Sequence, residues 1–186
     1  YSFLIPSSVI ELEKGWCCET RYLNKIKISP NNPRYYFLDE TMIIGKSSLD
    51  SKEYDTLVFC SRNAQKVKIP NFIQTIEQFS FSDCEDDQFQ IEISIDSKLR
   101  TIEKNAFCWS SIKSLTIPSN LIELKTGWCY ELSYLTEIYV SPKNPRYSII
   151  EGKMIVGKSS LELDEYDTIE FCSRNAKRIK IPNYIK

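Results

Sequence analysis

Histidine is absent from this sequence of 186 residues, and glycine occurs only five times. Without histidine the chain lacks the commonest general base and the commonest zinc ligand, and no Ser–His or Cys–His nucleophile pair can form within it. Its glycines form neither of the glycine-rich motifs that bind phosphate groups. These absences argue against common classes of enzyme. We therefore expect a protein that is not an enzyme, with no cofactor and no metal site.

Strong charge and long apolar runs are also missing. The formal net charge is −1, so no overall field attracts nucleic acid, and we expect no nucleic-acid partner. No apolar run approaches 18 residues, so no segment is expected to span a membrane. None of the asparagines lies in an N-x-S/T sequon, which favours a non-glycosylated setting. The chain begins with Tyr1, inside a repeated pattern, and we expect it to be part of a longer chain.

The seven cysteines are an odd number and are not spaced as C-x-x-C. Cys17 corresponds to Cys129 and Cys60 to Cys172, each pair 112 residues apart. A thiol that recurs once per repeat usually fills a small buried slot, where free cysteine behaves as a compact apolar side chain. This interpretation is favoured over disulfides and over metal ligation.

The chain repeats itself at two scales. Residues 5–73 align without a gap with residues 117–185, and roughly 40 of the aligned pairs are identical. Within this long period, short stretches that alternate apolar and polar residues recur about every 23 residues, with one longer unit of about 41 in each cycle. Such alternation predicts half-buried strands, which are often ended by proline. The stretches are FLIP, IKIS, VKIP, IEISID, LTIP, IYVS and IKIP.

A second set of apolar residues follows each predicted strand. One such unit cannot bury its own apolar face, but stacked units can, through continuous ladders of side chains. The expected core ladder contains Val9, Leu12, Trp16, Phe72, Ile76, Phe81, Leu99, Ile102, Phe107, Leu121, Leu124 and Trp128.

The longer unit contains an irregular passage that is written twice. The sequences "TMIIGKSSL" and "YDTLVF", and their copies, predict two strands joined by a polar loop, so that a β-hairpin accounts for the extra residues. Asn32-Pro33 and Asn144-Pro145 are typical of turns. The NPRY sequence also matches an N-P-x-Y peptide read by adaptor domains, but its duplication favours a structural turn.

The segments Ile102 to Phe107, Ser110 to Pro118 and Leu121 to Leu124 resemble the BspA-like leucine-rich repeats, and the long unit resembles the hairpin-bearing repeat of that family. The resemblance covers nearly the whole chain. It implies a leucine-rich-repeat solenoid over residues 1–186, mostly β and with about seven coils. A parallel concave sheet of short strands, β-hairpin insertions in two long coils and few or short helices are expected.

On such a sheet the apolar side chains point inward and their neighbours point outward. Lys25, Lys27, Lys66 and Lys68 are then expected to form a basic patch on neighbouring coils that docks an acidic protein. Lysine on exposed strands also discourages edge pairing, which is the competing explanation. The complete set of candidate partner-binding residues is Lys25, Lys27, Lys66, Lys68, Thr116, Tyr139, Arg178 and Lys180.

The resemblance implies a protein-binding scaffold of the surface-antigen type, associated with adhesion. The alternative is a structural component inside the cell, docked into a larger assembly such as a cytoskeletal lattice. Reduced cysteines and the missing sequons favour this alternative weakly, whereas the family favours the cell surface, so the location stays open.

Overall fold

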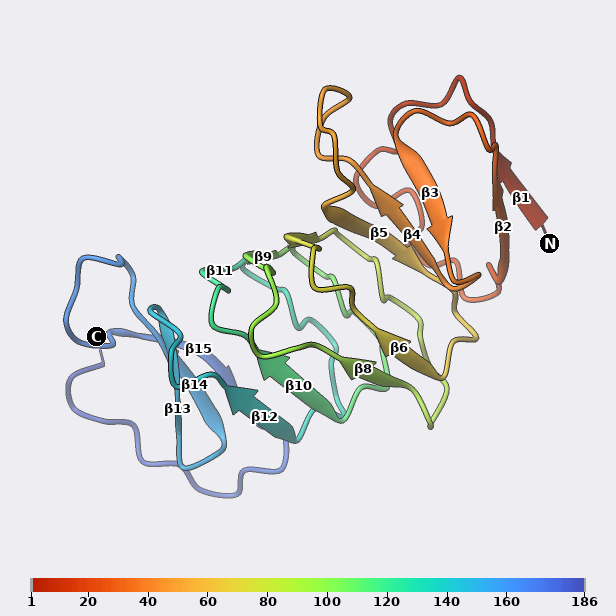
Figure 1. The fold of residues 1–186 in the computed structure, drawn as a ribbon. Coiled ribbons are helices and arrows are strands. Elements are labelled where there is room, and N and C mark those ends of the chain that lie inside the picture. Colours follow the sequence, from red (N-terminus) through yellow and green to blue (C-terminus); the bar gives the residue numbers. More distant parts are fainter. Residues whose placement is uncertain (1, 186) are drawn as a thin grey trace.

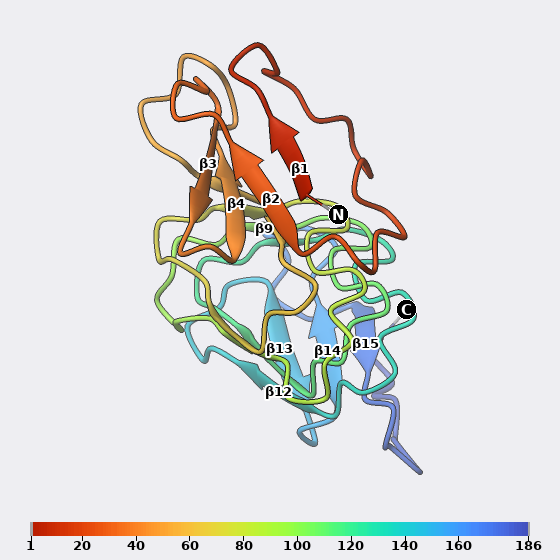
Figure 2. The ribbon, with the colours of Figure 1, turned by 90° about the vertical axis from the view of Figure 1, so that its right-hand side faces the viewer.

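The structure, a computed structural model, describes residues 2–185 as a solenoid of short coils stacked along one axis (Figure 1). It contains fifteen short β-strands, and no α-helix occurs among the described residues. Along the stack, successive coils lie over one another (Figure 2). The predicted leucine-rich-repeat solenoid with parallel sheets is confirmed, with about six turns rather than about seven.

The alternating stretches form a first ladder of parallel strands. Each apolar side chain is registered with the equivalent apolar residue of the next coil, such as Ile5 with Ile28 and Ile117 with Val140. Backbone hydrogen bonding in parallel ladders thus places like residues side by side. The strand pairs are β1 (Ser2–Ile5) with β2 (Lys25–Ile28), β6 (Lys66–Lys68) with β8 (Gln90–Glu92), and β10 (Ser114–Ile117) with β12 (Glu137–Val140).

The predicted strands at residues 91–96 and 179–182 differ from the structure. The backbone N–H of Ile69 is bonded to the carbonyl of Glu92, whereas that of Ser119 is bonded to the carbonyl of Ile95. β8 is thus paired with the preceding coil up to Glu92, whereas residues 93–96 form no strand with either neighbour. Residues 179–182 form no strand, because no neighbouring segment is paired with them among the described residues.

A second parallel ladder lies on another side of the coils and was not predicted. Its strands β7 (Thr75–Ile76), β9 (Thr101–Ile102) and β11 (Glu123–Leu124) are only two residues long. Each contains the middle residue of the second apolar set of its coil, which is Ile76, Ile102 or Leu124, and all three residues are buried. Two residues give too short an alternation for a sequence pattern to reveal a strand.

Each long coil carries a three-stranded antiparallel sheet. In the first, β3 (Tyr35–Leu38) pairs with β4 (Met42–Gly45), and β4 pairs with β5 (Thr56–Cys60). The predicted β4–β5 hairpin is confirmed, but β3 was not predicted. β5 also pairs in parallel with β7, so the hairpin is hydrogen-bonded into the second ladder. The second copy consists of β13 (Tyr147–Ile150), β14 (Met154–Gly157) and β15 (Thr168–Cys172).

The turn between β3 and β4 has a backbone conformation that explains its sequence. Asp39 and Glu40 both have positive φ values, 49° and 53°. Two successive residues of this kind make the type I′ turn that suits the twist of a tight hairpin. In the copy, Glu151 and Gly152 occupy these positions with φ values of 51° and 65°, so Gly152 relieves part of the steric cost.

The core consists of a large cluster of aromatic and aliphatic side chains and a smaller one at the N-terminal coils. The ring of Phe107 lies 5.3 Å from that of Phe81 and 6.3 Å from that of Trp128, and Trp128 lies 5.8 Å from Phe171. Rings at these separations attract one another beyond their burial of apolar area. The predicted ladder is confirmed from Ile76 to Trp128, whereas Val9, Leu12 and Trp16 are only partly buried. Phe72 is 40% exposed, and its neighbour Ile73 is fully buried instead.

Cysteine occupies a slot that is set by the neighbouring aromatic residue. Gly15 and Asn105 both have positive φ values and mark the same place in their turns. The next two residues are Trp16-Cys17 in one turn and Ala106-Phe107 in the other, so the large side chain comes first in one and second in the other. The small side chain fills the remaining position in each turn, which preserves the total core volume. The predicted burial is confirmed for Cys17, Cys60, Cys84 and Cys108, whereas Cys129 is half-buried and Cys172 is exposed.

The duplicated NPRY sequence is a structural brace. The side-chain amide of Asn32 donates hydrogen bonds to the carbonyls of Pro6 and Val9, and its oxygen accepts from the backbone of Arg34 and Tyr35. Asn144 makes the same four bonds in the copy. The Tyr35 hydroxyl accepts a hydrogen bond from the Leu12 N–H, and Tyr147 does so from Leu124. The predicted structural turn accounts for the repetition, because the asparagine and the tyrosine of each NPRY copy bond the inserted sheet to the preceding coil.

The core register can be tested at two adjacent residues. Ile73→Ala should lower the free energy of unfolding by about 2–5 kcal/mol, because it leaves a cavity in the ladder. Phe72→Ala removes a larger side chain but should cost less than about 1 kcal/mol, because that side chain is partly exposed. Urea denaturation followed by fluorescence measures both. A greater loss for Phe72→Ala would contradict the register.

The hydrogen bonds of Asn32 can be tested with a second matched pair of variants. Asn32→Ala should destabilise the protein by about 2–4 kcal/mol, because two carbonyls and two N–H groups lose their partners in a buried site. Asn31→Ala, at the adjacent exposed position, should change stability by less than about 0.5 kcal/mol. Equal denaturation midpoints for these two variants would show that Asn32 does not hold the coil.

Candidate interaction surface

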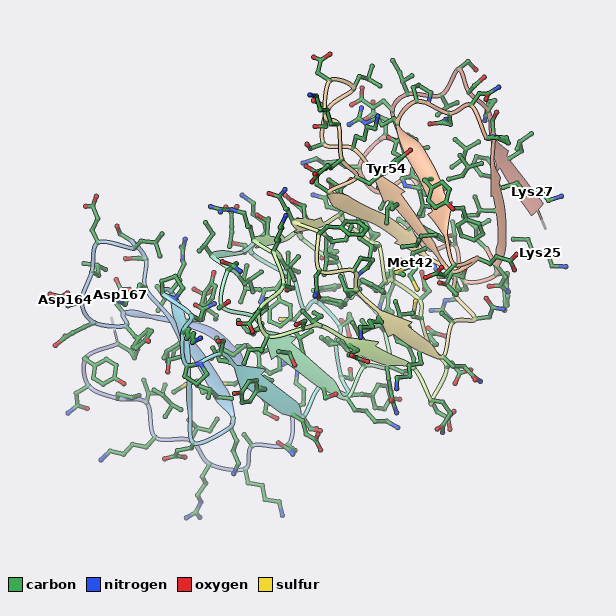
Figure 3. The ribbon with its side chains drawn as sticks, viewed as in Figure 1. Lys25, Lys27, Met42, Tyr54, Asp164 and Asp167 are labelled. Atoms are coloured by element: carbon green, nitrogen blue, oxygen red, sulfur yellow. The ribbon has the colours of Figure 1, made fainter. Side chains whose placement is uncertain are left out.

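The solvent side of the first ladder carries alternating exposed side chains, and we call it the open face. Lys25 and Lys27 are exposed on β2, and Lys66 and Lys68 on β6, with a buried residue between each pair. The predicted outward orientation is therefore confirmed for all four lysines. Lys25 and Lys27 project from the N-terminal end of the stack (Figure 3).

The structure separates the two lysine pairs. β2 and β6 belong to different two-stranded sheets, and β3 of the hairpin is packed beside β2. The strands that carry the two lysine pairs are therefore not adjacent, because the inserted hairpin takes the place beside β2. The predicted basic patch on neighbouring coils stays a prediction. Lys68 also forms an ion pair with Glu92, with 3.2 Å between nitrogen and oxygen, which offsets part of the charge on β6.

The open face is hollowed beside β2 and at the β10–β12 pair, and predicted residues line both places. Lys25 and Lys27 line a hollow of about 440 Å³ together with Phe37 and Glu40 of the hairpin. Thr116 and Tyr139 are direct partners in the β10–β12 ladder and line a hollow of about 270 Å³. Tyr139 is 52% exposed, so an aromatic ring is available for contact beside a concave surface.

The last two predicted residues are not brought to this surface by a strand. Arg178 and Lys180 are exposed, but they lie in irregular backbone close to the end of the described residues. The structure therefore groups the candidates into three sets, namely Lys25 with Lys27, Lys66 with Lys68, and Thr116 with Tyr139. Their part in binding stays a prediction.

A third hollow, of about 430 Å³, lies between the hairpin base and the coils on either side, and we call it the hairpin cleft. It was not predicted. One wall is formed by residues 11–16, including Trp16, and another by Arg34, Tyr35 and Lys46. The opposite wall carries Glu77 and Glu103, so groups of both charges face the same space.

Burial raises the pKa of Glu77, and the neighbouring charge of Glu103 raises it further. Lys14 and Arg34 oppose this shift, but the net direction is upward. Raising the pKa of a carboxyl group means that its charged form is disfavoured in the fold. The positive charges of Lys14 and Arg34 therefore only partly balance the negative charge of Glu77 in the cleft.

A signal for the cleft was present in the duplication. Arg34, Tyr35 and Lys46 recur as Arg146, Tyr147 and Lys158. Part of this recurrence is structural, because the Arg34 guanidinium donates to the carbonyls of Ile10 and Lys46 at 2.9 and 3.2 Å. Sequence spacing alone could not show that the hairpin holds two coils apart and leaves a space between them.

No three His, Cys, Asp or Glu side chains are grouped to hold a metal ion within residues 2–185. The same described part of the chain contains no helix long and apolar enough to cross a membrane.

The profile of the BspA type leucine rich repeat region, in six copies, matches residues 52–162. The chain belongs to this family of repeats. Leucine-rich-repeat solenoids of this kind are generally scaffolds that mediate protein interaction. No significant match occurs among curated proteins.

Solved structures share the fold at low sequence identity. A leucine-rich repeat protein from Eubacterium ventriosum is 20% identical, with a TM-score of 0.63 over 75% of this chain and 36% of its own. A leucine rich cell surface protein from Faecalibacterium prausnitzii is 18% identical, with a TM-score of 0.58 over 99% of this chain and 49% of its own. The pneumococcal vaccine antigen PcpA is 17% identical, with a TM-score of 0.56 over 77% and 40%. The chain thus spans less than half the length of each of them.

The raised pKa of Glu77 gives a testable pH dependence. Between about pH 4.3, the ordinary pKa of glutamate, and the higher pKa in the fold, the native state binds more protons than the unfolded state. This group therefore lowers stability as pH rises through that window. The stability of wild type relative to Glu77→Gln should fall from pH 4 to pH 7 in denaturant titrations. Glu53→Gln, outside the cleft, is the control, and parallel curves for wild type and Glu77→Gln would contradict the shift.

Proposed function

We propose that the chain is a non-enzymatic scaffold that binds a protein partner through the open face. The observation that carries this proposal is the coincidence of exposed candidate residues with the hollows beside β2 and at β10–β12. The strands lie about 4.8 Å apart, so their outward side chains form a regular grid. A grid of this kind binds by complementary shape and charge.

The two hollows differ in chemistry, which indicates two kinds of contact. The hollow at β2 presents two lysines, and charges at the rim of an interface mainly guide association and orientation. The hollow at β10–β12 presents Tyr139, and partly exposed tyrosines are frequent binding hot spots. An acidic segment of a partner over β2 and an apolar side chain beside Tyr139 fit this division.

A role at the cell surface, as an adhesin or antigen, is the first form of this proposal. It is supported by the family and by the name of the Faecalibacterium prausnitzii protein, which is described as a cell surface protein.

A structural role inside the cell, docked into a larger assembly, is the second form. The seven free thiols favour it, because reducing compartments preserve them.

Site-specific cross-linking tests which side of the solenoid binds. A photoreactive amino acid placed at Lys27 or Tyr139 of the full-length protein in its own cells should capture a discrete protein. The same group at Lys104, which is exposed just after β9 in the second ladder, should not. Capture at Lys104 alone would show that the open face is not the interface.

Charge reversal then tests the role of the lysines against the captured partner. Lys27→Glu combined with Lys66→Glu should weaken binding at least about tenfold, because both substitutions repel an acidic surface. Both sites are exposed, so the free energy of unfolding should change by less than about 0.5 kcal/mol. Lys68 is left unchanged, because its substitution would place two carboxylates side by side. Unaltered binding in biolayer interferometry would reject the acidic-partner form of the proposal.

A further inference from the structure

Arg62 is a buried cation that lies where three segments of the stack meet. It follows β5 and is only 4% exposed. Its two terminal nitrogens donate to four backbone carbonyls, those of Cys60 and Ser80 and those of Cys17 and Phe79, at 2.9–3.2 Å. Its guanidinium carbon lies 4.5 Å from the centre of the Phe59 ring. Arg62 thus joins the hairpin to the coils before and after it.

This cation has no carboxylate partner among the described residues. Carbonyl oxygens satisfy its terminal N–H groups but bring no negative charge, and its Nε has no hydrogen-bond partner. A buried charge is costly unless it is paired with an opposite charge. The charge of this cation acts on four thiols, those of Cys17, Cys18, Cys60 and Cys84.

Two of these thiols lie at the same backbone carbonyl. Cys60 ends β5 and Cys84 lies on the next coil, and both are fully buried. Their sulfur atoms lie 3.6 and 4.0 Å from the same acceptor, the carbonyl oxygen of Ser61. The charge of Arg62 acts on both thiols.

We propose that Cys60 and Cys84 are a redox-active dithiol, which hydrogen peroxide converts into a disulfide that links the hairpin to the following coil. The convergence of the two buried thiols on the Ser61 carbonyl and the uncompensated charge of Arg62 carry this inference. It does not depend on the proposed protein-binding role.

The environment assigns different parts to the two sulfurs. Burial and the neighbouring Asp83 carboxylate raise the pKa of Cys84, but the Cys60 thiol and the charge of Arg62 outweigh them, so that its pKa is lowered. The pKa of Cys60 is raised by the neighbouring Cys84 thiol and by burial. Cys84 is therefore the attacking thiolate and Cys60 the resolving thiol, since the thiolate is the nucleophile.

The reaction balances with one molecule of peroxide. The Cys84 thiolate attacks one peroxide oxygen, the O–O bond breaks and hydroxide leaves, which gives a sulfenic acid on Cys84. The Cys60 sulfur then attacks the Cys84 sulfur, an S–S bond forms and the sulfenic oxygen leaves as water. Two thiols are oxidised and one peroxide is reduced to two molecules of water. Both thiols are buried, so the reaction requires a local opening of the coil that admits peroxide.

The duplication supplies an internal control. Cys172 is the copy of Cys60, but it is exposed, whereas Cys60 is fully buried. Cys172 therefore shares the local sequence but not the buried surroundings. Peroxide should oxidise Cys172 without forming the cross-link, whereas Cys60 should be oxidised only into the cross-link.

Peptide mapping tests the proposal on the intact reduced chain. After treatment with hydrogen peroxide, acid quenching and alkylation, trypsin should release residues 53–62 joined to residues 69–98 through one disulfide. Cys172→Ser should retain this cross-link, and Cys60→Ser and Cys84→Ser should lose it. Free Cys60 and Cys84 in the wild type, with Cys172 oxidised, would overturn the proposal, and so would a disulfide between Cys60 and any other cysteine.

The role of Arg62 is tested by the rate at which the disulfide forms rather than by its final yield. Arg62→Met should slow formation of the cross-link at least tenfold near neutral pH, because the Cys84 thiolate loses its counter-ion. The difference should shrink as pH is raised, because a thiol without the cation also ionises at high pH. A rate equal to that of wild type across the pH range would remove Arg62 from the mechanism. If Arg62→Met does not fold, the pH dependence of the wild-type rate decides instead, since a normal thiol profile would also reject the role of Arg62.

Discussion

Stacking is the constraint on which this structure depends. A single coil has an apolar side that it cannot cover, so each coil is stable only against its neighbours. This requirement fixes the register of both ladders, because an apolar residue must meet its equivalent at each step. It also explains why Trp16-Cys17 can replace the order found in Ala106-Phe107, since the combined volume matters more than the position of the ring.

The hairpin coils solve a separate problem, which is how to insert about 20 extra residues without ending the stack. The asparagine and tyrosine of NPRY tie β3 to the preceding coil, and β5 joins the following coil through β7. The inserted sheet is therefore hydrogen-bonded both to the coil before it and to the coil after it. The same insertion separates β2 from β6 and opens the hairpin cleft, so features relevant to binding arise where the simple repeat is interrupted.

The sequence revealed features that recur with a fixed period and missed those that depend on local geometry. The duplicated hairpin and most core residues were predictable because each is written more than once. Ile73 was mistaken for its neighbour Phe72, because both are apolar and only the hydrogen-bonded register distinguishes them. The separation of the strands that carry the lysine pairs depends on which segments the hairpin brings together, and no spacing in one chain encodes that. The same is true of the convergence of Cys60 and Cys84 on the Ser61 carbonyl.

The offset of 112 residues is kept strand by strand, since β10, β12, β13, β14 and β15 each begin 112 positions after β1, β2, β3, β4 and β5. A crossover between the two copies in the gene would therefore remove or add one whole unit and still join matching ladder ends. The stack can change its length by such steps without creating a junction of new sequence. Variation in the number of units is thus compatible with folding, and it would alter the reach of the protein while leaving its surface chemistry the same.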